Sequence, residues 1–123
     1  MSMPSRILVA TEPIDFRKQI EGIAALVDQT LRERSLSGTL FVFTNRRRDA
    51  LKMLVWDHGG FVLIYKKLEV GRFRLPASTA DRMVLSPAEL AAVIEGIDLR
   101  GAKKLSRWNP KNVLDDRSGA VTS

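Results

Sequence analysis

Residues 39–68, TLFVFTNRRRDALKMLVWDHGGFVLIYKKL, contain three apolar runs that are rich in β-branched and aromatic residues. Short runs of this composition, separated by polar connections, are typical of β-strands. The runs are residues 39–44, 50–56 and 61–68, with NRRRD and DHGG between them. The two glycines can adopt the positive φ that a tight hairpin needs, which brings Trp56 and Phe61 close together across the strands. The stretch predicts a three-stranded antiparallel meander.

A strand and an amphipathic helix are predicted before the meander. The strand is RILVA, residues 6–10, and Asp15 is a candidate N-cap for the helix. The apolar positions of that helix recur at the spacing of one helical face: Phe16, Ile20, Ile23, Ala24, Val27 and Leu31. Turn residues at positions 35–38 predict where this helix ends.

After the meander, residues 82–85 (RMVL) predict a short additional strand, and residues 86–89 (SPAE) predict the start of a helix that runs to Gly96. Ser86 is followed by proline at the first helical position and by glutamate three residues after the cap. The expected fold is α+β, in the order β-α-β-β-β-(β)-α. The long helix is expected to pack on one face of a largely antiparallel sheet.

Length and composition predict one domain over residues 1–100, followed by a basic, disordered tail over residues 101–123. The chain has no cysteine, which excludes a disulfide framework and a thiolate zinc site. No apolar run approaches the roughly 20 residues that span a bilayer, and no export signal is recognised, so we expect a cytoplasmic protein without a membrane anchor.

Charge indicates the kind of partner. The 123 residues carry a net charge of +6, and the pI is about 10.2. Residues 46–74 contain eight Lys and Arg residues and three Asp and Glu residues, which gives this stretch a net charge of +5. A basic stretch of this kind is typical of proteins that bind polyanions, so DNA is the expected partner.

The run Arg46, Arg47 and Arg48 is the best candidate for a binding site, because guanidinium groups bind phosphate oxygens bidentately. A solvated loop paired with Asp49 and Glu69 is the alternative interpretation. Five further basic residues are expected to join the arginines in one ribbon that fits a major groove: Lys52, Lys66, Lys67, Arg72 and Arg74. Four aromatic residues interleave with this set and favour core packing over base stacking: Trp56, Phe61, Tyr65 and Phe73. Trp108 lies apart, in the basic tail.

Catalysis is not predicted. His58 is the only histidine, and its position between Asp57 and Gly59 favours an exposed turn residue. The carboxylates that a magnesium-dependent nuclease would need all have simpler structural roles as caps, turn residues or strand ends: Asp15, Asp49, Asp57 and Glu69. We therefore predict no catalytic residue, no metal site and no cofactor.

Several motifs resemble one family along residues 7–98, in order and with family-like spacing. They include DFRK at residues 15–18, GTLFVF at 38–43, the pairs at 46–47 and 56–57, KKLE at 66–69 and GRF at 71–73. The sequence is similar to the small transposition accessory protein TnpB of the bacterial insertion-sequence family numbered sixty-six, not to the RNA-guided nuclease of the same name. It departs from the usual pattern at Gln19, Glu21, His58 and Leu99.

The resemblance implies a partner of a separately encoded transposase. Two hypotheses fit it equally: an accessory protein that binds DNA through backbone phosphates, and an adaptor that holds the transposase or a second accessory subunit with little DNA contact. A small metal-dependent nuclease is a third, weaker alternative. The sequence leaves the oligomeric state open.

Overall fold

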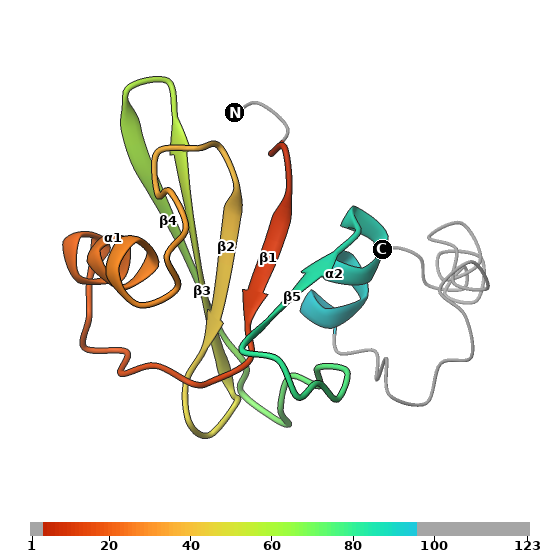
Figure 1. Cartoon of the computed structure of the whole chain (residues 1–123). Helices are drawn as coiled ribbons and strands as arrows, with labels where there is room; N and C mark the ends of the chain where they lie inside the picture. Colours follow the sequence, from red (N-terminus) through yellow and green to blue (C-terminus); the bar gives the residue numbers. More distant parts are fainter. Residues whose placement is uncertain (1–3, 96–123) are drawn as a thin grey trace.

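The structure, a computed structural model, describes residues 4–95 (Figure 1). In chain order its elements are β1 (Ile7–Ala10), α1 (Ile20–Gln29), β2 (Leu40–Thr44), β3 (Ala50–Asp57), β4 (Gly60–Lys67), β5 (Arg82–Leu85) and α2 (Pro87–Ile94). The five strands form one sheet in the order β4-β3-β2-β1-β5. The predicted α+β class and element order are confirmed, and residues 82–85 are an edge strand. The predicted tail, with Trp108, lies outside the described residues.

The sheet is antiparallel except at its centre. β1 and β2 run parallel, with Leu8 opposite Phe41, and α1 connects them. β2, β3 and β4 form the predicted antiparallel meander, and β5 is antiparallel to β1. Because β1 and β2 are parallel, their carboxyl ends lie at the same end of the sheet.

Both faces of the sheet are covered. On one face, α1 packs Ile23, Ala24 and Val27 against the strands, together with Leu8 and Phe41. The other face buries a second cluster, to which α2 contributes Leu90, Ala92 and Val93, and residues after β4 contribute Phe73 and Leu75. Figure 1 shows α1 and α2 on opposite sides of the strands. All five residues of β2 are buried, as expected for a strand enclosed on both faces.

The first helix is shorter than predicted, and Asp15 is not its N-cap. The cap position is Gln19, whose side chain makes no capping hydrogen bond. Asp15 closes a turn instead: its Oδ1 accepts from the Arg17 N–H at 2.9 Å, and its backbone carbonyl accepts from Lys18. Aspartate competes for nearby backbone donors in this way, so the helix begins one turn later.

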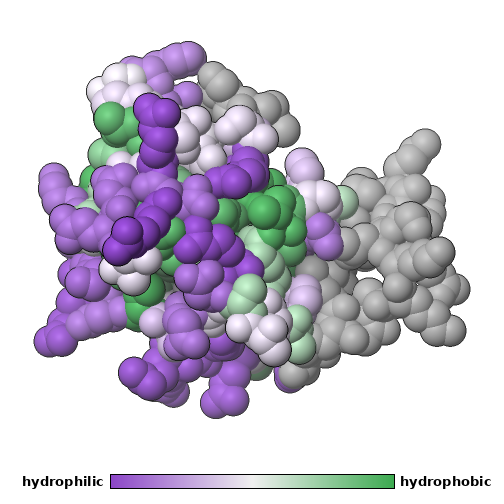
Figure 2. All heavy atoms as spheres, viewed as in Figure 1, coloured by the Kyte–Doolittle hydropathy of each residue, from purple (hydrophilic) through white to green (hydrophobic). Residues whose placement is uncertain are grey.

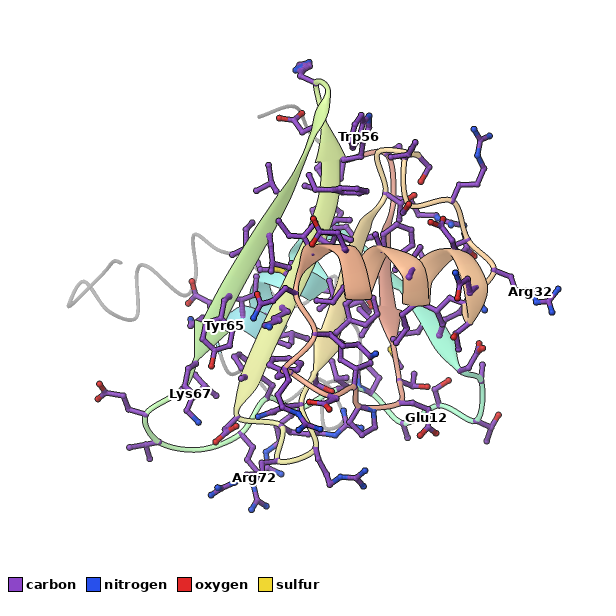
Figure 3. The ribbon with its side chains drawn as sticks, turned by 90° about the vertical axis from the view of Figure 1, so that its left-hand side faces the viewer. Glu12, Arg32, Trp56, Tyr65, Lys67 and Arg72 are labelled. Atoms are coloured by element: carbon purple, nitrogen blue, oxygen red, sulfur yellow. The ribbon has the colours of Figure 1, made fainter. Side chains whose placement is uncertain are left out.

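Lys52 is a core residue, contrary to its prediction as a DNA-binding residue. It is 5% exposed. Its Nζ donates to the backbone carbonyls of Phe16 (2.9 Å) and Lys18 (2.8 Å). The ammonium also lies over the rings of Phe16 and Tyr65, at 5.1 and 5.7 Å from their centroids. Tyr65 is labelled on β4 in Figure 3. Lys52 therefore fixes the turn before α1 to the sheet, and its charge does not reach solvent.

Local signals for the second helix and for the hairpin are confirmed. Ser86 Oγ accepts from the Glu89 N–H, and the Glu89 carboxylate accepts from the Ser86 N–H, so the capping box is complete. Trp56 and Phe61 are opposite each other, with ring centroids 5.0 Å apart in an edge-to-face arrangement. No helix within residues 4–95 is long and apolar enough to cross a membrane.

The β3–β4 hairpin turns over two residues, His58 at φ 49° and Gly59 at φ 85°. Two consecutive positive φ values match the twist of the flanking strands. The prediction that both glycines supply positive φ is wrong: His58 takes the first position, and Gly60 already belongs to β4.

The two glycines of this turn form a matched test. Gly59→Ala should destabilise the fold by about 1–2 kcal/mol, because an alanine Cβ is strained at φ 85°. Gly60→Ala should cost less than about 0.5 kcal/mol, since its φ lies outside the left-handed region and a Cβ there meets no atom within 4 Å. Urea unfolding of the two variants measures the difference. Equal losses would contradict the backbone explanation.

Lys52→Met should lower the free energy of unfolding by about 1–3 kcal/mol, because the Phe16 and Lys18 carbonyls lose their donor. Lys18→Met removes the same charge from an exposed side chain and serves as the control, with an expected change below about 0.5 kcal/mol. Denaturant unfolding of both variants at matched pH is the measurement. An unchanged stability for Lys52→Met would show that these hydrogen bonds do not hold the turn.

Candidate nucleic-acid interface

The candidate interface lies at the carboxyl end of the parallel pair β1 and β2. Two segments meet there: residues 45–49, which connect β2 to β3, and residues 71–78, which follow β4. In Figure 1 both segments lie at the lower end of the sheet, and Figure 2 shows hydrophilic side chains gathered over that end. Crevices beyond the carboxyl ends of parallel strands are common binding positions in sheets with crossover helices.

Residues 45–49 form a tight loop, which we call the arginine loop. The Asn45 carbonyl accepts from the Arg48 N–H at 3.1 Å, and the Asn45 side-chain Oδ1 accepts from the Asp49 and Ala50 N–H groups at 3.0 and 3.1 Å. Arg46 and Arg47 lie at the tip and are exposed. Arg48 has a φ of 59°, a left-handed backbone conformation that residues other than glycine adopt at an energetic cost. These hydrogen bonds thus hold the loop backbone without using the side chains of Arg46 and Arg47, which remain exposed.

The second segment is attached directly to the arginine loop. The Phe73 N–H donates to the Arg48 carbonyl at 2.7 Å. Phe73 and Leu75 are 2% and 8% exposed, whereas Arg72 and Arg74 are on the surface. This alternation buries two apolar anchors and holds the two guanidinium groups beside the loop. Figure 3 shows Arg72 at this end of the molecule, pointing away from the sheet.

The two segments enclose a groove of about 790 Å³, which we call the arginine groove. Its lining contains five arginines and no acidic residue: Thr11, Arg46, Arg47, Arg48, Arg72, Phe73, Arg74, Leu75, Pro76, Ala77, Ser78 and Met83. Arg48 Nη2 donates to the Thr11 carbonyl at 3.1 Å. Among the described residues, Arg46, Arg72 and Arg74 form no ion pair. Uncompensated guanidinium groups around a hollow are suited to bind anions.

Asp49 lies beside the groove, and its carboxylate already accepts hydrogen bonds from two other side chains. Asn45 Nδ2 donates to it at 2.6 Å and Lys67 Nζ at 2.9 Å, and these bonds lower the pKa of Asp49 to about 2. Arg47 Nε is 4.0 Å from the same carboxylate and its side chain is 81% exposed. Asp49 is therefore already engaged by Asn45 and Lys67, and Arg47 remains accessible.

The basic surface continues toward α1. Arg17, Arg46 and Arg47 together line a second hollow of about 480 Å³. Arg17 binds the Asp15 carboxylate, with Nη2 2.7 Å from Oδ2, which lowers the pKa of Asp15 to about 2 and raises the pKa of Arg17. The resemblance included Arg17, but the site prediction omitted it. The β-α-β order of the sequence, which favours a parallel pair, was the signal that could have placed residues 11–17 at this end.

The predicted basic ribbon along β3 and β4 does not form. Lys52 is buried under the turn before α1, and Lys66 Nζ donates to the Ile94 carbonyl of α2. Lys52 and Lys66 belong to opposite faces of the sheet, because Lys52 pairs with Tyr65, the neighbour of Lys66. Of the eight predicted residues, the structure gathers five in the arginine groove and places Lys67 beside it.

Aromatic side chains do not line the groove with open ring faces. Phe73 belongs to the lining but is 2% exposed, in agreement with core packing. Trp56 and Phe61 pack together at the hairpin, far from Arg72 in Figure 3, where Trp56 is labelled at the opposite end of the sheet. The groove lining thus offers five arginines for charged contacts and no open ring face for base stacking.

The other chemical candidates are dispersed. Within residues 4–95, no three His, Asp or Glu side chains come close enough together to hold a metal ion. His58 is exposed in the hairpin turn, as predicted, with Nδ1 3.8 Å from Asp57 Oδ1.

Comparison with known proteins agrees with the resemblance seen in the sequence. A family model described as IS66 Orf2 like protein matches residues 5–104. Two curated proteins of Sinorhizobium fredii (strain NBRC 101917 / NGR234) are similar over 108 residues, which cover 88% of this chain and 92% of each relative. "Uncharacterized protein y4jC" is 36% identical, and "Uncharacterized protein y4hO" is 34% identical. No solved structure matches the chain. The chain therefore belongs to the family of IS66 Orf2-like proteins.

Proposed function

We propose that this protein is a non-catalytic accessory protein of insertion-sequence transposition that binds DNA through its backbone phosphates in the arginine groove. Family membership indicates the role in transposition. The observation that supports DNA as the ligand is the gathering of five arginines from two segments around one groove without an acidic residue. The partner within the element is its transposase or a second accessory subunit.

The geometry favours phosphate over other anions in one respect: the positive groups are spread along a groove. Arg46 and Arg47 project from one segment and Arg72 and Arg74 from the other, so charges line both walls. A phosphodiester backbone offers repeated negative charges that can occupy such an arrangement, and each guanidinium can make bidentate bonds to phosphate oxygens. Backbone contacts carry no sequence information, so the proposed binding is largely independent of sequence.

The arginine pair at each wall can be tested separately. Arg46→Gln with Arg47→Gln, and Arg72→Gln with Arg74→Gln, should each flatten the slope of log affinity against log salt by roughly two units, because each lost phosphate contact contributes about 0.9. The control is Arg32→Gln with Arg34→Gln, an exposed pair that follows α1; Figure 3 shows Arg32 well apart from Arg72. Fluorescence anisotropy with a labelled duplex over a salt series gives the slopes.

The control pair removes the same amount of charge, but from outside the groove. The salt slope of this variant should therefore stay within experimental error of the parent's slope. If both pairs of groove variants behave like the control, the affinity arises from general charge and the groove is not the site. If the parent binds no duplex at low salt, the adaptor hypothesis replaces DNA binding.

The groove should also prefer duplex to single strands of equal length. In this proposal its arginines bind phosphate groups. Phe73, the aromatic residue of its lining, is buried, so unpaired bases find no ring to stack on there. Duplex DNA presents more phosphates per unit length and should bind at least several-fold more tightly at low salt. Competition of unlabelled single strands against a bound duplex measures this ratio. Tighter binding of single strands would indicate a base-stacking surface elsewhere.

A further inference from the structure

The edge strand β4 has the features of a pairing surface. It is the first strand of the sheet, so within residues 4–95 only β3 pairs with it. Its eight residues pair with β3 without a bulge, and its middle, residues 61–65 (FVLIY), has no charge and no proline. Ile64 and Tyr65 are 36% and 56% exposed. Proteins usually protect such edges with charge, proline, bulges or very short strands.

The opposite edge, β5, has that protection. It contains four residues and begins at Arg82, which forms ion pairs with Glu33 and Asp81. The difference between the two edges singles out β4.

The direction of the backbone groups of β4 follows from a hydrogen bond next to the strand. The Leu68 N–H donates to the Asp49 carbonyl, so residues 68 and 49 form a hydrogen-bonded pair. Hydrogen-bonded pairs alternate along an antiparallel ladder, which makes 64 and 53, and 62 and 55, pairs of the same kind. The N–H and carbonyl groups of Phe61, Leu63 and Tyr65 consequently point to the free edge, where another strand can accept and donate.

We propose that β4 pairs antiparallel with β4 of a second copy of this chain, centred on Ile64, to form one continuous ten-stranded sheet. In this register Ile64 lies opposite Ile64 of the second copy, and Leu63 lies opposite its Tyr65. These pairs place apolar side chains of the same face next to each other. In the same register Lys66 and Lys67 lie opposite Val62 and Phe61 of the second copy, away from its lysines. A parallel arrangement would place the lysines beside each other, so charge favours the antiparallel one.

Charge substitution at position 64 tests the pairing. Sedimentation velocity over a concentration series should show a monomer–dimer equilibrium for the full chain. Ile64→Lys should weaken the dimer by on the order of tenfold or more, because two ammonium groups then face each other across the axis. Val84→Lys is the matched control, since Val84 is 60% exposed on the other edge strand, and this variant should dimerise like the parent. Thermal unfolding verifies that both variants fold.

A mixture of Ile64→Lys with Ile64→Asp supplies a test that folding defects cannot imitate. Each variant alone should be mainly monomeric, whereas the mixture should regain dimer, because unlike charges then face each other at position 64. Failure of the mixture to associate overturns the pairing. A parent chain that stays monomeric up to about 1 mM, or an equal loss of dimer in Val84→Lys, overturns it as well. The proposal does not depend on DNA binding, since no arginine of the groove is altered.

Discussion

Helices and loops bury both faces of the five-stranded sheet, α1 on one side and α2 with Phe73 and Leu75 on the other. A sheet enclosed in this way can present functional groups only at its two ends and along its two outer strands. The carboxyl end of β1 and β2 holds the arginine groove, and β4 is an outer strand that, within residues 4–95, pairs with β3 alone. Enclosure thus determines where the sheet itself can present a binding surface, before the identity of any surface residue is considered.

The arginine groove concentrates like charges, which the fold must tolerate without a ligand. Their repulsion is limited because the guanidinium groups are mostly exposed to water, where charges interact weakly. The backbone is fixed independently of them, by the Asn45 side chain, by the Phe73–Arg48 hydrogen bond and by the buried Phe73. Arg48 also holds a left-handed conformation, a strain of the kind that often accompanies functional loops. The site is therefore arranged before a ligand arrives.

Much of the fold was predictable because its signals are local. The meander of residues 39–68, the capping box at Ser86 and the Trp56–Phe61 contact depend on neighbouring residues or on one tight turn. The start of α1 was not predictable from periodicity. Lys52, 34 positions away from Lys18, binds the carbonyls of the preceding turn, and Asp15 binds the backbone of that turn rather than capping a helix.

The candidate site was predicted in part for the same reason. The run at residues 46–48 and the arginines at 72 and 74 are visible in the sequence, and the structure brings them together. Their shared groove depends on a hydrogen bond between residues 73 and 48, which no local pattern reveals. Charge alone could not separate these residues from Lys52 and Lys66, because burial and partners are tertiary properties. Basic composition led to the expectation of a polyanionic ligand, and only packing distinguished the side chains that are exposed around the groove.

The two proposed surfaces have a definite relation to each other. β4 runs parallel to β2, because each is antiparallel to β3, so the arginine groove lies at the carboxyl end of β4 as well. Lys67, the last residue of β4, accordingly contacts Asp49 of the arginine loop. Antiparallel pairing of two β4 strands would put the two carboxyl ends at opposite ends of the joint sheet. The two grooves would then face away from each other, and a dimer would hold two separate phosphate backbones rather than enclose one.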